Sequence, residues 1–157
     1  MFLKITRLFL ALLVSFFVVS CSQSCKKTET KKGVFFINLK HDDTISSPVL
    51  VKFGVEGMTV RPAMEDVHEK TSGHHHLLID NPEGFTPQGM AVPKDDHHIH
   101  YGQGQTEDTI TLSPGLHTLT LQFADGAHLS YGKPMATTIT IRVEPPKEPE
   151  DLMPEDS

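Results

Sequence analysis

Apolar and polar residues alternate in three segments of the chain, at residues 49–55, 117–123 and 139–143. In the second segment Leu119 and Leu121 fall on one face, while the threonines between them fall on the other. A period of two with β-branched residues is typical of strands that bury one face. Similar runs predict four further strands, at residues 34–39, 74–80, 98–101 and 108–112.

Turn-forming residues separate these segments. They include Ser47-Pro48, Asn81-Pro82-Glu83-Gly84, Ser113-Pro114-Gly115 and Asp125-Gly126. About seven short strands in roughly 110 residues favour an all-β fold, an immunoglobulin-like antiparallel β-sandwich. A closed β-barrel is the alternative.

The N-terminal segment predicts export. Lys4 and Arg7 precede an apolar run at residues 8–19, which is too short to span a bilayer of about 30 Å as a helix. The junction Val18-Val19-Ser20-Cys21 resembles the bacterial lipobox, whose cysteine is lipidated on sulfur and becomes the mature N-terminus. We therefore expect residues 1–20 to be a lipoprotein signal peptide, Cys21 to be the lipid attachment site, and the protein to lie in the cell envelope, on the periplasmic side or the cell surface. The alternative is an ordinary signal peptide with an incidental cysteine.

Composition divides the remaining chain into three parts. Residues 21–32 predict a flexible polar tether, residues 33–143 the β-sandwich domain, and residues 144–157 an acidic, proline-rich disordered tail. The formal net charge is −6 at pH 7, and an acidic protein repels nucleic acid, so we expect no role there. With Cys21 lipidated, Cys25 has no partner for an internal disulfide. The membrane, through the lipid, and a metal ion are the partners we expect.

Histidines gather in two of the predicted strands. Alternate residues of a strand share a face, so His74 projects with His76, and His98 projects with His100. If the two strands are neighbours, four imidazoles meet on one outward, exposed face and can bind one ion. The alternative is that these histidines are structural, exposed or hydrogen-bonded on a polar face of the sheet.

Three further histidines have different expected roles. His128 lies in the loop after Asp125-Gly126 and is a candidate fifth metal ligand, with Asp125 as a partner that orients a ring. His75 shares the inward face of its strand with Leu77. His117 also shares an inward face, and we expect it to fill a corner of the fold and bond a backbone carbonyl.

Imidazole ligands without thiolates suit Zn(II), Cu(II) or Ni(II), so we expect copper or zinc. A ring must be neutral to bind metal, and the unperturbed pKa of histidine is about 6.5. Metal affinity is therefore expected to fall as the pH drops through the range near 6.

Several blocks of the chain together resemble a family of small exported bacterial domains, the domain of unknown function 4399. The blocks are Ser46-Ser47-Pro48-Val49, residues 51–58, Ser72-Gly73-His74-His75-His76-Leu77-Leu78-Ile79-Asp80, residues 98–107, and Pro114-Gly115-Leu116-His117-Thr118-Leu119. The resemblance implies an exported, sandwich-like domain and no established activity. Family members often carry His-x-Pro-His after the last hairpin, where this chain has His128-Leu129-Ser130-Tyr131 and lacks the second histidine.

The sequence thus predicts a lipid-anchored extracytoplasmic domain that binds a transition metal for storage, buffering or delivery. It singles out no acid–base pair and no nucleophile elbow, so we expect binding rather than catalysis. Two alternatives stand beside this one. The first is an adhesion or assembly module with structural histidines. The second is an enzyme like copper-zinc superoxide dismutase, whose intramolecular disulfide cannot form with Cys25 alone.

Overall fold

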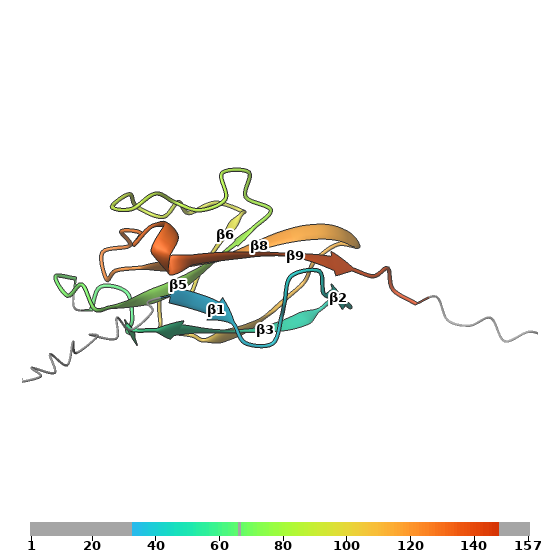
Figure 1. Ribbon diagram of the computed structural model, residues 1–157, viewed down its shortest axis with the longest axis horizontal. Helices are drawn as coiled ribbons and strands as arrows, with labels where there is room; N and C mark the ends of the chain where they lie inside the picture. Colours follow the sequence, from blue (N-terminus) through green and yellow to red (C-terminus); the bar gives the residue numbers. More distant parts are fainter. Residues whose placement is uncertain (1–32, 66, 148–157) are drawn as a thin grey trace, which may run out of the picture.

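The structure, a computed structural model, describes residues 33–65 and 67–147. Two β-sheets pack face to face around one core (Figure 1). The smaller sheet has the strand order β1-β3-β7, and the larger has the order β2-β9-β8-β5-β4, with β6 also paired to β5. The strands are β1 (Gly33–Phe36), β2 (Thr44–Ile45), β3 (Val49–Glu56), β4 (Thr59–Val60), β5 (Ser72–Ile79), β6 (His98–His100), β7 (Glu107–Ile110), β8 (Gly115–Ala124) and β9 (Ala136–Val143).

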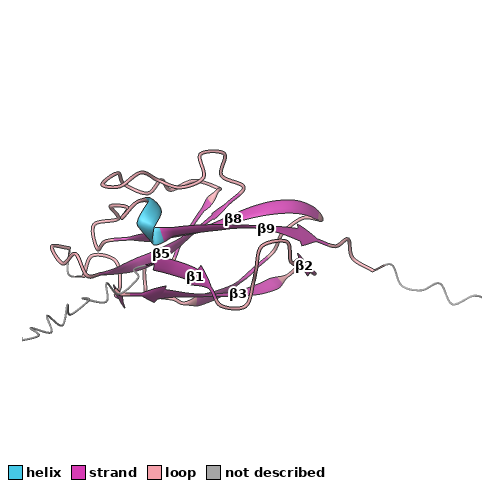
Figure 2. Ribbon diagram, in the orientation of Figure 1, coloured by secondary structure: helices cyan, strands magenta, loops and turns pink. Residues whose placement is uncertain are grey.

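Loops connect nearly all of these strands (Figure 2). One short 3₁₀ helix, η1 (Lys133–Met135), precedes β9. Within the described residues no helix is long and apolar enough to cross a membrane. The predictions for Cys21, for the signal peptide and tether, and for the tail beyond Lys147 concern residues outside the described part of the chain.

The alternating residues identified in the sequence form the core. They point between the two sheets and are completely buried, because each strand presents every second side chain to the opposite sheet. These residues are Val51, Phe53, Leu77, Leu119, Leu121, Phe123 and Ile141. The predicted all-β sandwich is confirmed, and the separate strand orders of the two sheets argue against the closed barrel.

The sequence predicted purely antiparallel pairing, and this prediction is wrong for two strands. β2 runs parallel to β9, and β4 runs parallel to β5. Both added strands are only two residues long, so they carry no periodicity that the sequence pattern could reveal.

Two loops, residues 81–97 and 125–131, cover the outer face of the larger sheet. In Figure 1 the yellow-green loop lies over this sheet, on the side away from β3. We call the loops of residues 81–97 and 125–131 the cover. Gln122 of β8 binds both loops. Its Oε1 accepts a hydrogen bond from Thr86 N at 2.9 Å, and its Nε2 donates to Thr86 O at 2.7 Å and also to Ser130 Oγ. An isolated bridge between Ala91 and Leu129 joins the two loops.

The corner predicted for His117 is confirmed. Its Nε2 lies 2.8 Å from Ser113 O, and its Nδ1 lies 2.7 Å from Asp80 Oδ2. Burial lowers the pKa of His117, but the bonds to Asp80 and Ser113 outweigh it and hold the pKa above its usual value. Because both ring nitrogens face acceptors, this histidine is committed to the fold rather than to a ligand.

Candidate metal centre

Four imidazole rings converge under the edge of the cover. We call His74, His76, His100 and His128 the histidine centre. Strand register explains the first three: His76 and His100 are direct partners across β5 and β6, and His74 lies two residues earlier on the same face. The fourth arrives because His74 also pairs with Ala124, the last residue of β8, so the loop after β8 begins beside it.

The ring geometry matches four ligands around one ion. Nε2 of His74 lies 3.0 Å from Nε2 of His76, and Nε2 of His100 lies 3.1 Å from Nε2 of His128. All six distances between ring centroids fall between 4.8 and 6.1 Å. Metal–nitrogen bonds of about 2.0–2.1 Å in a tetrahedron place the nitrogens about 3.3 Å apart and the ring centroids about 5.2 Å apart. Five of the six centroid distances lie close to this value, and the distance between His76 and His128 is longer.

The fourth ring is held less closely than the other three. Ligand nitrogens of His74, His76 and His100 all lie within 4.8 Å of one another. The longest centroid distance, 6.1 Å, separates His76 from His128. His128 also sits in a loop, with a positive φ of 64°. The sheet thus fixes three imidazoles, and the loop places a fourth beside them.

The sequence predicted that His74 and His76 are exposed, but both are buried. His74 and His76 are at most 2% exposed, because the cover lies on their face of the sheet. His100 is exposed and His128 is half-buried, so the centre opens toward solvent on their side.

Burial keeps the two histidines that β5 contributes to the centre neutral well below physiological pH. It lowers the pKa of His74 to about 4 and that of His76 to about 2, and the neighbouring imidazoles lower both further. Burial, His128 and Lys94 also lower the pKa of His100. Protons should therefore compete with a metal ion at a lower pH than the value near 6 that unperturbed histidines predict.

Gly102 makes room for the ring of His100. A Cβ on Gly102 would lie 2.2 Å from Cε1 and 2.5 Å from Nε2 of that ring. Only the end of a flexible side chain is in the way, so the ring can swing aside without disturbing the backbone. We therefore expect Gly102→Ala to displace a metal ligand while leaving the fold intact.

The Gly102→Ala variant should bind Zn(II) at least about tenfold more weakly at pH 7.5. Its free energy of unfolding should change by less than about 1 kcal/mol, as measured by urea titration of the metal-free protein. Gly33→Ala is the matched control, because a Cβ there would meet nothing closer than 4.0 Å. Zinc affinity equal to that of the control would show that His100 does not bind the ion.

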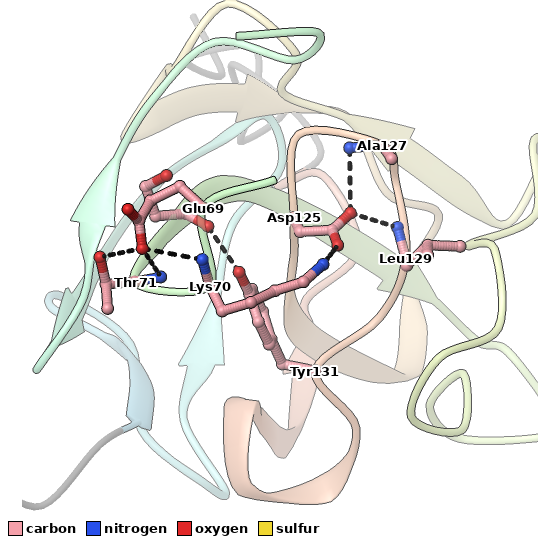
Figure 3. Close-up of polar contacts among 8 residues, drawn as sticks. Glu69, Lys70, Thr71, Asp125, Ala127, Leu129 and Tyr131 are labelled. Carbon is pink, nitrogen blue, oxygen red and sulfur yellow. Dashed lines mark hydrogen bonds and ion pairs between the residues drawn. The ribbon is translucent and has the colours of Figure 1, made fainter. Parts of the chain in front are cut away.

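Asp125 shapes the loop that presents His128 (Figure 3). Its Oδ1 accepts hydrogen bonds from the backbone N–H groups of Ala127 and Leu129, both at 2.9 Å, and its Oδ2 lies 2.6 Å from Lys70 Nζ. The carboxylate is only 2% exposed. Burial raises the pKa of Asp125, but Lys70 and the backbone donors outweigh it and hold the pKa below its usual value. The sequence predicted that Asp125 orients an imidazole ring. In the structure Asp125 instead positions His128 through the backbone of the loop.

Asp125→Ala should destabilise the metal-free protein by about 1–3 kcal/mol, because two part-buried N–H groups lose their acceptor and Lys70 loses its ionic partner. It should also weaken Zn(II) binding by about tenfold, since His128 is no longer held in place. Asp125→Asn keeps an oxygen for the two N–H groups and should lose clearly less of both. Urea and zinc titrations of the two variants check this, and equal losses in both would contradict the role of the backbone contacts.

The structure places His98 and His75 outside this group. His98 lies opposite Leu78, two pairs further along β5 and β6 than the pair of His76 and His100, and its Nδ1 is 2.6 Å from Asp95 Oδ1. His75 points inward, as expected, and packs edge-on against the rings of Phe53 and Phe123, with centroids 4.9 and 4.8 Å away. Gly102 and Gln122 were not identified from the sequence, because neither belongs to a residue type that binds metal.

A family model described as "Domain of unknown function (DUF4399)" matches residues 51–144. The match runs from β3 to the end of β9 and includes all four members of the histidine centre. The chain matches no curated protein and no solved structure. The chain belongs to the DUF4399 family, whose function is not assigned.

Proposed function

We propose that this protein binds one transition-metal ion, copper or zinc, at the histidine centre, and that it stores, buffers or delivers that ion. The observation that carries the proposal is the convergence of three imidazoles whose ligand nitrogens lie within 4.8 Å of one another, with the ring of His128 next to those of His74 and His100.

The donor set defines the class of ion. In the described part of the chain, the group of metal-binding side chains is formed by imidazoles alone, without a thiolate or a carboxylate. Imidazole nitrogens favour Zn(II), Cu(II) and Ni(II), whereas Mg(II) and Ca(II) prefer oxygen ligands. Four protein ligands also fill a tetrahedral sphere and leave no position for a substrate, which favours binding over catalysis.

The accessibility of the centre favours exchange over permanent retention. Two ligands lie deep in the sheet, but His100 is exposed and His128 belongs to a surface loop. An ion held in this way can be reached from one side by a chelator or by a partner protein. This arrangement suits a protein that takes up metal and releases it.

Metal analysis tests the proposed function. Protein without an affinity tag, loaded with Zn(II) or Cu(II) and then desalted at pH 7.5, should retain one equivalent of metal. Elemental analysis against protein concentration measures the ratio. Metal at the background level of the buffer would overturn the proposal.

The proposal places this centre outside the cytoplasm, on a lipid anchor at Cys21. The positive start, the apolar run and Ser20 before Cys21 support the anchor. Cys21→Ala should leave the protein uncleaved or release it in soluble form, and detergent partitioning with mass spectrometry of the mature N-terminus detects either outcome. A variant that still carries acyl chains would contradict the assignment.

A further inference from the structure

His98 has a buried ring nitrogen that the fold does not use. The side chain is only 4% exposed, and none of the described residues offers a hydrogen-bond partner to its Nε2. A buried polar atom without a partner is unfavourable, so one in a native fold calls for a specific explanation.

The other ring nitrogen shows which form of His98 is present. Its Nδ1 lies 2.6 Å from Asp95 Oδ1, and the hydrogen bond to His98 lowers the pKa of Asp95. The ionised carboxylate accepts, so Nδ1 must donate, and in the tautomer that this bond selects the lone pair lies on Nε2. A carboxylate that fixes the tautomer and direction of a histidine in this way is typical of metal ligands.

The register places His98 next to the histidine centre. His98 and His100 are alternate residues of β6, so they share the face on which His76 lies. His98 is a diagonal neighbour of His76, since it pairs with Leu78, two residues further along β5. Diagonal neighbours in a sheet are within reach of long side chains. The unpartnered ring nitrogens of His75 lie among the aromatic rings of the core, whereas His98 lies on the face of the sheet that carries the histidine centre.

We propose that His98 is a reserve ligand of the metal ion, which replaces His128 when the loop carrying that residue moves away. The inference rests on the proposed metal-binding function. It assigns the ion two alternative fourth ligands: His128 from the loop, and His98 from the sheet edge, oriented by Asp95. His128 is the member to be exchanged because its ring lies farthest from that of His76. The exchange keeps the ion bound by four imidazoles while the exposed side of the centre opens.

A double-mutant cycle in the full chain tests the reserve role. Zn(II) affinities are measured at pH 7.5 by competition with a chromogenic chelator, for wild type, His98→Phe, His128→Ala and the double variant. His98→Phe alone should weaken binding by about two- to threefold, and His128→Ala alone by about tenfold. In the His128→Ala background, His98→Phe should cost at least about a further tenfold, because no fourth imidazole is then left.

The outcomes separate this inference from the function on which it rests. If the effect of His98→Phe is the same in both backgrounds, His98 is not a reserve ligand. A loss in the single variant as large as that caused by His76→Ala would make it a permanent ligand and also overturn the proposal. If wild type binds no Zn(II), the proposed function itself fails.

Two further variants keep the test decisive. His97→Gln is the control, because it alters the neighbouring residue, whose Nδ1 lies 2.8 Å from Ile79 O. It should change the Zn(II) affinity neither of the wild type nor of His128→Ala. Asp95→Asn removes the carboxylate that orients His98. Combined with His128→Ala, it should weaken Zn(II) binding by more than the two single losses together, but by less than His98→Phe does. This comparison remains available if His98→Phe does not fold. An additive result for Asp95→Asn as well would exclude the reserve role.

Discussion

Replacing His76 with alanine is expected to weaken Zn(II) or Cu(II) binding at pH 7.5 by about a hundredfold. Four-ligand zinc sites in small proteins bind with about 10–16 kcal/mol, so the loss of one ligand corresponds to roughly 3 kcal/mol. His76 is the member that the fold places most firmly, because it is buried and pairs with both His100 and Gln122. Calorimetric titration of the tag-free protein measures the effect.

His100→Ala should cause a loss of similar size, since it removes the direct partner of His76 across the strands. His41→Ala is the control: that ring accepts a hydrogen bond from Thr140 of β9, and its removal should not change metal affinity. Binding by the His76 and His100 variants at the wild-type level would favour the structural interpretation of these histidines.

Acid should unfold the metal-free protein steeply, and this is the second large effect. Burial lowers the pKa values of His74, His75 and His76 to about 4, 3 and 2. The unfolded chain therefore takes up three protons near pH 6.5 that the folded chain does not, and stability falls with decreasing pH below that point. Each proton corresponds to about 1.4 kcal/mol per pH unit, so the combined slope reaches about 4 kcal/mol per unit.

With a stability of about 5–15 kcal/mol, the domain should unfold between about pH 5.5 and 3. Urea titrations at several pH values measure the slope of stability against pH. Above pH 7 these histidines should add nothing to that slope. His75→Leu should reduce the slope by about a third and leave metal affinity unchanged, because its ring packs against Phe53 and Phe123 rather than in the centre. A stability that stays constant between pH 7 and 5 would contradict the burial of neutral histidines.

The local pattern of the sequence was sufficient to predict the strands other than β2 and β4, and the facing of the histidines. Alternation located β3, β8 and β9, and it correctly turned His75 and Leu77 inward, while His74 and His76 turned to the other face. These properties depend on residues two positions apart in one strand, so the chain itself encodes them.

The assembly of the centre could not be read from the sequence, because it depends on contacts between distant segments. The pairing of β5 with β6 brings His76 opposite His100 across more than twenty residues of chain. The burial of this face depends on the loop of residues 81–97, which has no periodicity and is held by Gln122. The position of His128 depends on Asp125 and Lys70, which are also far apart in the chain.

X-ray absorption spectroscopy of the metal-loaded protein tests the central claim most directly. The histidine centre predicts an inner shell of four nitrogen atoms at about 2.0–2.1 Å for Zn(II), with the outer-shell scattering that is typical of imidazole rings. The loss of His76 should remove one of these imidazoles from the spectrum. A shell dominated by water or carboxylate oxygen, with one imidazole or none, would contradict a metal centre built from these four histidines.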